Sequence, residues 1–393
     1  MNRRDLLKAG ILAAGLAAAG CSGVKNGAKS DYDDLNITPK QTATYEFSSP
    51  LPFNFALIDE MYEYNKTLHK SKVTSLYNNL PMPYISFLEE NFQSNRGENT
   101  DIKSFDDFAK YVKYAQKKGF EFFYVLNSPK PFSEETFRKH EKDFYHLLDQ
   151  LHNIGCNNIK VANTQVADII QAYKHKFDLT LSTSFEFRNI PQYQNLMFTA
   201  KKIKTINVAT DNNHNFHFLR NLRKEFPKTP IELIVNERCI YGCPGRIPHA
   251  STFFCIWDCY GLLKKIGHMA YFCKCNYVFP WDLEYYSAIG VNNFKLISFP
   301  LRAKFDSIFF LRNYIDCVEK GIDNMTVNDF FSGIYDIHDI RTKTDVKLSE
   351  IKDLFPDVRH FVKYGNRCAD ICGVECRYCF ECADKLKKTG MFE

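Results

Sequence analysis

The sequence predicts an α/β protein folded as a (β/α)8 TIM-like barrel, with a cysteine-rich insertion after the seventh strand and a cysteine-rich C-terminal tail. Eight short runs rich in β-branched and aromatic residues follow one another between residues 42 and 299. They alternate with longer amphipathic stretches, which is typical of parallel α/β folds. A doubly wound open sheet is the competing arrangement, but no glycine-rich phosphate loop follows any of the runs.

The predicted strands are short and contain many of the residue types that favour β-structure. In chain order they begin at Thr42 (TATYEFS), Lys72 (KVTSLY), Phe120 (FEFFYVL), Asn158 (NIKVA), Leu179 (LTLST), Thr205 (TINVA), Ile231 (IELIV) and Asn293 (NFKLISF).

Two of the stretches between strands show where a helix begins and ends. Ser104 stands before an amphipathic run that ends at Gly119, and Ser133 and Gly155 bracket a second run. A serine hydroxyl accepts a hydrogen bond from a free N–H of the first turn, and glycine readily adopts the conformation that ends a helix. Both runs are therefore predicted to be helices with defined ends.

Composition places the chain among ordinary globular proteins. Its 393 residues are 45% hydrophobic and 25% charged, which is enough apolar material for one large domain or two small ones. The net charge of +5 is spread without a long basic run and indicates anionic partners only weakly. The 14 cysteines are bunched rather than scattered, which favours metal or iron–sulfur binding over disulfides.

The first 21 residues are predicted to be an export signal. Arg3 and Arg4 precede an apolar run that is too short to span a bilayer, and Cys21 follows this run. The segment is similar to a twin-arginine (Tat) signal joined to a lipobox, in which Cys21 would become the lipidated N-terminus. We therefore expect a lipoprotein at the periplasmic face of the membrane. An accidental amphipathic start of a cytoplasmic protein is the alternative.

The rest of the chain divides into three predicted parts. Residues 22–41 are a flexible polar tether, residues 42–345 form the barrel, and residues 346–393 form the cysteine-rich C-terminal segment. If the protein is exported, the membrane is an expected partner through Cys21 and nucleic acid is not.

Polar residues follow most of the predicted strands at their carboxyl ends, where TIM barrels carry their chemistry. Each of them alone also fits a turn residue or a helix cap. Together they predict a polar ring at the mouth of the barrel. The ring comprises Asn127, Ser128, Asn163, Ser182, Ser184, Asp211, Asn212, Asn236, Glu237 and Arg238.

Four cysteines, Cys239, Cys243, Cys255 and Cys259, follow the seventh strand within one short stretch. Four thiolates can hold a 4Fe-4S cluster or a structural zinc. Each pair encloses three residues rather than the two typical of zinc ribbons, and aromatic neighbours would shield a redox cluster. An iron–sulfur cluster is therefore favoured, with zinc and free thiols left open and with "YFCKC", which carries Cys273 and Cys275, as a source of substitute ligands.

Five more cysteines lie near the C-terminus. They are Cys368, Cys372, Cys376, Cys379 and Cys382. The segment CGVECRYC has the spacing of the radical SAM motif, but in that superfamily the motif precedes the barrel, so we reject this interpretation. A second cluster and a zinc knuckle both fit the tail.

Several segments stand in an order that resembles peptidase family U32, the collagenase-like proteins. They are FFYVLNS, IKVANTQVADII, IELIVNERCIYGCPGRIPH, CIWDC and PWDLEYYSAIGVNNFKLISFPLRA, and the cysteine-rich ending is similar as well. The similarity runs from about Phe53 to the end of the chain and is strongest to short iron–sulfur members related to oxygen-independent hydroxylases. It implies a barrel-like fold with a 4Fe-4S cluster, and the ligands that it implies are Cys239, Cys243, Cys255 and Cys259.

The resemblance implies a redox enzyme that acts on a small organic substrate, with an electron donor or a related U32 protein as partner. The residues expected to orient the substrate are Asn127, Asn163, Asn236 and Arg246. The first alternative is a peptidase that uses a thiol such as Cys239 with His249. The second is an exported metal-binding protein without catalysis. His249 fits a ligand, a proton carrier or simply a packed histidine.

Overall fold

The computed structural model describes most of the chain from residue 35 onward. The described residues are 35–78, 102, 104–126, 128, 131–199, 203–237, 239–246, 273–297, 308–332 and 346–391. Those from Asn36 onward belong to one compact unit. The predicted signal and Cys21 lie outside the described residues, as does most of the tether. Within the described part, no helix is both long enough and apolar enough to cross a membrane.

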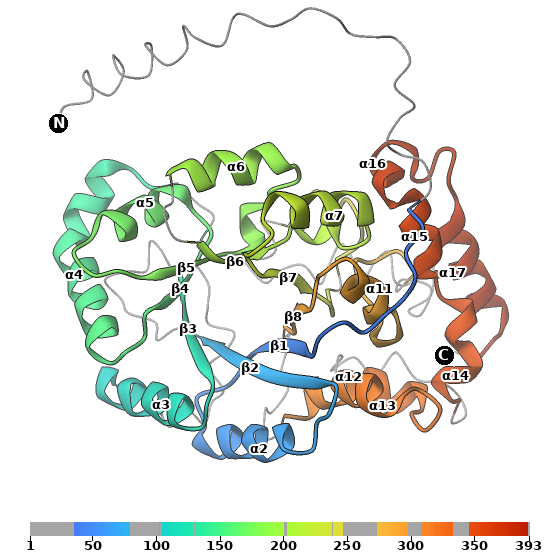
Figure 1. The fold of residues 1–393 in the computed structure, drawn as a ribbon, viewed down its shortest axis with the longest axis horizontal. Helices are drawn as coiled ribbons and strands as arrows, with labels where there is room; N and C mark the ends of the chain where they lie inside the picture. The colour runs from blue at the N-terminus through green and yellow to red at the C-terminus, as the bar shows by residue number, and fades with distance from the viewer. Residues whose placement is uncertain are drawn as a thin grey trace, which may run out of the picture. The chain divides into compact units, whose positions relative to one another are not determined.

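Eight parallel strands close into a barrel in chain order, which confirms the predicted (β/α)8 fold (Figure 1). Each strand pairs with the next, and the last pairs with the first. Each of the eight predicted runs overlaps one of these strands. The strands are β1 (Tyr45–Pro50), β2 (Ser71–Asn78), β3 (Glu121–Leu126), β4 (Asn158–Val161), β5 (Asp178–Leu181), β6 (Ile203–Asn207), β7 (Ile231–Ile234) and β8 (Asn293–Lys295).

Helices surround the strands and fill the connections between them (Figure 1). The α-helices are α2 (Phe55–Asn65), α3 (Phe105–Lys117), α4 (Glu134–Asn153), α5 (Thr164–Ala172), α6 (Ile190–Thr199), α7 (Phe216–Glu225), α11 (Leu283–Ala288), α12 (Phe309–Lys320), α13 (Val327–Ser332), α14 (Leu348–Ile351), α15 (Val358–Tyr364), α16 (Cys368–Ile371) and α17 (Tyr378–Lys388). Short 3-10 helices are η3 (Thr183–Phe185), η4 (Thr210–Asn212), η5 (Pro280–Asp282), η6 (Lys352–Leu354) and η7 (Gly365–Arg367).

The helix ends lie where the local residues predict them. Ser104 accepts a hydrogen bond from the N–H of Asp107 at the start of α3, and Ser133 caps α4 in the same way. Gly119 and Gly155 follow the two helices with φ of 89° and 78°, a conformation that a side chain would strain. These local signals fix how each helix leaves and rejoins the barrel.

The interior of the barrel is more polar than that of most TIM barrels, where branched apolar residues dominate. Tyr77, Phe123 and Val125 form a small apolar cluster there. Beside them lie Lys160 and Glu232, whose side chains are only 3% and 8% exposed. The pair joins β4 to β7, which are not neighbouring strands, so its contact crosses the interior of the barrel.

The cysteine-rich C-terminal segment packs on the barrel's helices. Phe361 of α15 stacks on His214 beside α7, with ring centroids 4.2 Å apart. Phe355 packs on Phe279 with centroids 4.8 Å apart. The segment is therefore attached through buried aromatic contacts, each of which adds to the apolar area removed from water.

Candidate functional site

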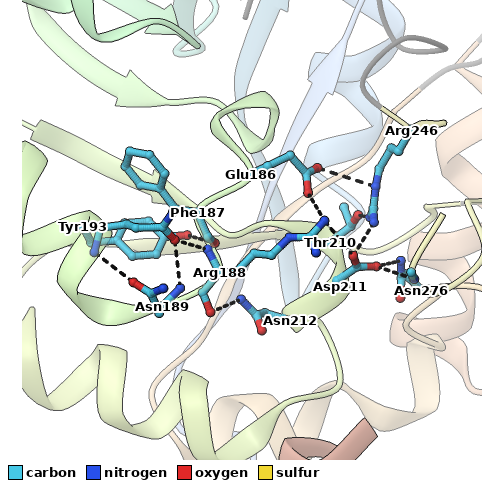
Figure 2. Close-up of polar contacts among 12 residues, drawn as sticks. Glu186, Phe187, Arg188, Asn189, Tyr193, Thr210, Asp211, Asn212, Arg246 and Asn276 are labelled. Carbon is cyan, nitrogen blue, oxygen red and sulfur yellow. Dashed lines mark hydrogen bonds and ion pairs between the residues drawn. The ribbon is translucent and has the colours of Figure 1, made fainter. Parts of the chain in front are cut away.

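An ionic network lies at the carboxyl ends of β5 and β6 (Figure 2). Arg246, which follows β7, places Nη2 2.5 Å from Oδ2 of Asp211 and Nε 3.5 Å from Oε1 of Glu186. These three side chains are only 7%, 9% and 16% exposed. Arg246 also donates a hydrogen bond to Thr210. Arg188, at 61% exposure, approaches both carboxylates from the solvent side at 3.5 and 3.6 Å, so the network is neutral overall.

Burial and charge act differently on the two carboxyl groups. Burial raises the pKa of Glu186, and the positive charge of Arg246 offsets only part of that effect. At Asp211 burial also opposes ionisation, but the hydrogen bond and the charge of Arg246 outweigh it and lower the pKa of this carboxyl. Arg246 is therefore what keeps Asp211 ionised in a largely buried position.

The backbone of Glu186 is strained. Its φ of 51° lies in the left-handed region, and it is the one non-glycine residue with positive φ in the described ranges. This conformation costs roughly 1–2 kcal/mol for a residue with a side chain, and it persists where the surroundings hold it in place. The ion pair with Arg246 is such a constraint, which marks this position as part of a site rather than a plain turn.

The first cysteine pair lies in a tight turn over this network. Gly242, between Cys239 and Cys243, has a φ of 68° and donates its N–H to Oδ1 of Asp211 at 3.0 Å. The N–H of Cys239 donates to Oε1 of Glu237 at 2.9 Å. The turn that carries the two thiols is thus held by two carboxylates at the mouth of the barrel.

Cys273 and Cys275 lie beside this turn. Ile240 and Cys275 form an antiparallel bridge, and Tyr241 donates its N–H to the carbonyl of Lys274 at 2.9 Å. Both of these cysteines are buried. Four cysteines from two separate stretches of sequence therefore share one small antiparallel element.

Two asparagines fix that element to the barrel. Asn213, which is fully buried, donates from Nδ2 to the carbonyls of Ile234 and Asn276, each at 2.8 Å. Asn276 in turn donates to Oδ1 of Asp211 at 3.1 Å. The cysteine turn, the segment beside it and the end of β7 are thereby joined through Asp211 and Asn213.

The tail thiols lie near the same element. Burial raises the pKa of Cys273, and the tail residues Cys382 and Cys379 raise it further. Burial together with neighbouring tail thiols raises the pKa of Cys379 as well. Lys274 places its ammonium 3.8 Å from the ring centre of Phe380, which fixes α17 beside this segment. The fold thus gathers the barrel-mouth cysteines and the tail cysteines in one region.

Burial and neighbouring thiols also raise the pKa values of Cys368 and Cys372. Burial, then Cys372 and Cys376, raise the pKa of Cys368 to about 11. The sulfur of Cys376 lies 3.6 Å from Nε2 of His360. A metal would have to displace protons from such thiols, so its binding would be favoured at higher pH.

The donor chemistry fits a soft metal or an iron–sulfur cluster, because the gathered groups are thiols. No three His, Cys, Asp or Glu side chains of the described residues converge on one point as a bound ion requires. Cys255 and Cys259, the other two predicted ligands, lie outside the described residues.

The structure places two of the predicted substrate-orienting asparagines in local roles. Asn163 caps α5 by accepting from the N–H of Gln165 at 2.8 Å. Asn236 donates to the carbonyl of Ile297 at 2.7 Å and accepts from its N–H at 2.9 Å, which ties the end of β7 to the end of β8. Contact of either residue with a substrate stays a prediction. Asn127, Arg238 and His249 lie outside the described residues.

The site includes residues that the sequence pattern alone did not join. Glu186 and Asn276 carried no motif, and Asp211 was only one of several strand-end residues. Glu186 adopts a left-handed backbone conformation directly after η3. Its residue type does not indicate this conformation in the sequence. Arg246 was singled out, but its two carboxylate partners come from positions 35 and 60 residues earlier in the chain.

Comparisons with known proteins find similarity to one peptidase family. The model of peptidase family U32 matches residues 87–253, a range that holds β3 to β7 and the first cysteine turn. Over this range the chain is similar to that family. An uncharacterized protease of Methanocaldococcus jannaschii is 22% identical over 310 residues, which cover 73% of this chain and 83% of that protein. A solved U32 peptidase aligns over 66% of this chain and 95% of its own, with 9% identity and a TM-score of 0.42.

The matched family is a peptidase family by name. The matched range ends at residue 253 and so contains Cys239, Cys243 and Arg246 but none of the tail cysteines. The features with direct structural support at the barrel mouth are therefore the cysteine turn and the ionic network beneath it.

Proposed function

We propose that this protein is a U32-type iron–sulfur redox enzyme that carries out oxygen-independent, hydroxylation-type chemistry on a small organic substrate. The observation that carries the proposal is the position of the Cys239–Cys243 turn. It lies at the catalytic end of a TIM barrel, and hydrogen bonds to Asp211 and Glu237 hold it there. A cofactor on this turn would face the mouth of the barrel.

The proposed ligands are Cys239, Cys243, Cys255 and Cys259, and the cluster, when bound, supplies electron transfer. The chain's own residues position it. Arg246 keeps Asp211 ionised, and Asp211 accepts the N–H of Gly242 at the centre of the turn. A preformed, hydrogen-bonded turn lowers the entropic cost of bringing thiolates together around a metal.

The tail cysteines form a second proposed metal site, either a cluster or zinc. Its thiols come from Cys368, Cys372, Cys376, Cys379 and Cys382. The effect of Cys379 and Cys382 on the pKa of Cys273 supports a role close to the first site. An electron donor or a related U32 protein is the proposed partner.

The test of the proposed function is a count of iron, acid-labile sulfide and zinc per chain in protein purified without oxygen. About four irons and four sulfides are expected for one cluster, and about eight of each if the tail binds a second one. Zinc without iron would contradict the redox proposal and would make the thiols structural.

Cys239→Ala is expected to remove the iron of the first site and its visible absorption, because a thiolate ligand is lost. Cys156→Ala is the matched control. It removes a buried thiol that packs beside β3, away from the turn. Retention of all iron in Cys239→Ala would rule out this ligand assignment, and equal loss in both variants would indicate general destabilisation instead.

The family name supports one further candidate, a peptidase with a thiol nucleophile such as Cys239 and a base such as His249. A nucleophile committed to iron cannot attack a peptide bond, so iron content and peptidase activity separate the two proposals. Peptidase activity in metal-free protein that is abolished by Cys239→Ala would favour this second candidate.

We also propose that the chain is exported through the Tat route and anchored at the periplasmic face by a lipid on Cys21. Replacing Arg3 and Arg4 by lysine is expected to leave the protein in the cytoplasm, because the twin-arginine signal is read by its receptor. Fractionation of cells that express either form measures this. Unchanged export of the double variant would contradict the Tat route, and a cytoplasmic wild type would contradict export itself.

A further inference from the structure

A histidine of the C-terminal segment faces one of the tail thiols. Nε2 of His360, on α15, lies 3.6 Å from the sulfur of Cys376, and both side chains are only partly exposed. In a tetrahedral zinc site a sulfur lies about 2.3 Å from the metal and a nitrogen about 2.0–2.1 Å, so the two ligand atoms are about 3.6 Å apart. The pair therefore has the separation of two ligands of one zinc ion.

The ring of His360 is held in this orientation by its neighbours. It stacks on Tyr378 with ring centroids 3.8 Å apart and 16° between the ring planes. The Tyr378 hydroxyl in turn accepts the N–H of Asp357 at 2.8 Å. Tyr378 lies between Cys376 and Cys379, two cysteines with the two-residue spacing typical of zinc ligands. A ligand whose ring is already fixed loses little conformational entropy when a metal binds.

Two more thiols belong to the same part of the tail, where α15, α16 and α17 meet (Figure 1). Cys372 and Cys376 form a backbone bridge, which closes the loop between them. The sulfur of Cys368 lies 4.0 Å from the carbonyl oxygen of Tyr364. Tyr364 follows His360 by four residues, so both lie on one face of α15. The helix thus presents its histidine to the segment that carries the thiols.

These thiols are numerous enough to complete a four-ligand site. Burial, followed by Cys368 and Cys372, raises the pKa of Cys379, as expected for thiols that are neighbours. Within the described residues the sulfurs do not converge with the histidine on one point. A cysteine sulfur moves by rotation about a single bond, and Cys372 is exposed, so side-chain rotation without refolding would bring them together.

The imidazole decides between the two kinds of metal centre that fit the tail. The 4Fe-4S clusters of proteins are held by thiolates, whereas three cysteines and one histidine are a common ligand set of structural zinc. Zinc has no redox chemistry in proteins, so a site of this kind stabilises the fold and carries no electrons.

We propose that the C-terminal segment binds one structural zinc ion through His360 and Cys376. Two further thiolates come from the group of Cys368, Cys372 and Cys379. The proposal rests on the second metal site of the proposed function and names its metal and its nitrogen ligand. It does not depend on the cluster of the first site, whose proposed ligands are other residues. The zinc links α15 to the loop before α17.

The experiment is metal analysis and zinc-edge X-ray absorption of the full chain, purified without oxygen. Wild type and Cys239→Ala are compared, because this variant lacks a proposed ligand of the first site. We expect about one zinc per chain in both, bound by three sulfurs at about 2.3 Å and one nitrogen at about 2.0–2.1 Å. Iron should be lost from Cys239→Ala while the zinc stays. Zinc with this ligand shell but no iron in the wild type would contradict the redox proposal and support this one.

Two variants of His360 and one control test the imidazole. His360→Ala is expected to weaken zinc binding at least about 100-fold in competition with a chromophoric chelator, because even a lost supporting group around a metal ligand costs about 10–100-fold. His360→Cys should bind zinc through four sulfurs, because it replaces one zinc ligand by another. His152→Ala, which removes a partly exposed histidine from the last turn of α4, should leave the zinc content and ligand shell unchanged.

Because His360 also packs on Tyr378, the alanine variant tests folding as well as binding. If it fails to fold, the nitrogen in the wild-type shell and its replacement by sulfur in His360→Cys still decide. The proposal is overturned if the chain holds no zinc, in which case the contact with Cys376 is a thiol–imidazole hydrogen bond only. It is equally overturned if four sulfurs bind the zinc of Cys239→Ala, if about eight irons replace the zinc, or if His360→Ala binds zinc as tightly as His152→Ala.

Discussion

Replacing Arg246 by methionine is expected to lower the free energy of unfolding by about 3–5 kcal/mol. The substitution removes the buried partner of two largely buried carboxylates, Asp211 and Glu186, and leaves only the exposed Arg188 beside them. The left-handed backbone of Glu186 loses the ion pair that helps to hold it. The measurement is urea unfolding of the full chain at pH 7, followed by circular dichroism.

Arg188→Met is the matched control for that variant. Arg188 approaches the same two carboxylates, at 3.5 and 3.6 Å, but it is 61% exposed. Exposed ion pairs contribute about 0–1 kcal/mol, so this variant should remain close to the wild type. Equal decreases in the free energy of unfolding in both variants would contradict the view that the buried guanidinium of Arg246 stabilises the network.

The decrease in the free energy of unfolding caused by Arg246→Met should depend on pH. Without Arg246, burial raises the pKa of both carboxyl groups above their unfolded values. The folded variant then binds more protons than the unfolded chain, so its stability rises as pH falls from 7 toward 5. The wild type should gain less, because only Glu186 has a raised pKa there and the pKa of Asp211 is lowered. A deficit that is the same at pH 5 and pH 7 would indicate packing rather than charge.

The same variant tests the link between the network and the cysteine turn. Asp211 accepts the N–H of Gly242, and its position depends on Arg246. If the turn carries the proposed cluster, Arg246→Met should lose iron even in the fraction that remains folded. Arg246→Lys keeps the charge but not the planar fork that reaches two carboxylates, so it should recover part of the stability and less of the iron.

The fold was predictable from the sequence because the signals for it are local. The runs that begin at Phe120, Asn158 and Ile231 combine β-branched and aromatic residues over short lengths, and the cap at Ser104 marks where α3 begins. A closed barrel then follows from eight repeats of one unit, which requires no knowledge of distant contacts. Strand ends shifted by a few residues at β1 and β6, where hydrogen bonding rather than composition decides the boundary.

The site was predictable only in part because its contacts are long-range. The cysteine turn after β7 stood out by residue type, but the partners of Arg246 depend on how three strand ends meet. Lys160 and Lys295 lie in two of the predicted strands, NIKVA and NFKLISF. The sequence of these strands does not show that both lysine side chains are buried inside the barrel rather than exposed to solvent. That fact depends on register, which a shift of one residue would reverse.

Gly365→Ala is the second change for which we expect a large effect. A Cβ at this position would lie 1.9 Å from the backbone carbonyl oxygen of His214, far inside van der Waals contact. The obstacle is backbone at the start of α7, so it cannot rotate away as a side chain would. The cost is expected to be about 3 kcal/mol or more, as strain or as separation of η7 from α7.

Separation of η7 from α7 would have a specific consequence for the thiols. The stacking of Phe361 on His214 attaches the C-terminal segment at the same place, and Cys379 and Cys382 lie near Cys273 only while the segment is docked. Cys273, which is 2% exposed, should then react with maleimide faster in Gly365→Ala than in the wild type. Proteolysis between the barrel and α15 should also become faster.

Gly390→Ala separates this clash from the ordinary cost of adding a side chain to glycine. Gly390 has a φ of 62° with nothing within 4 Å of a built Cβ, so alanine there costs only about 1 kcal/mol of backbone strain. If Gly365→Ala and Gly390→Ala had equal stability and equal Cys273 reactivity, the close approach at His214 would not hold the tail. If only Gly365→Ala exposed Cys273 and also lost zinc or iron, both the tail and the barrel mouth would be needed to bind the metal. The tail cysteines would then belong to the site at the carboxyl ends of the barrel strands and would not form an independent metal site.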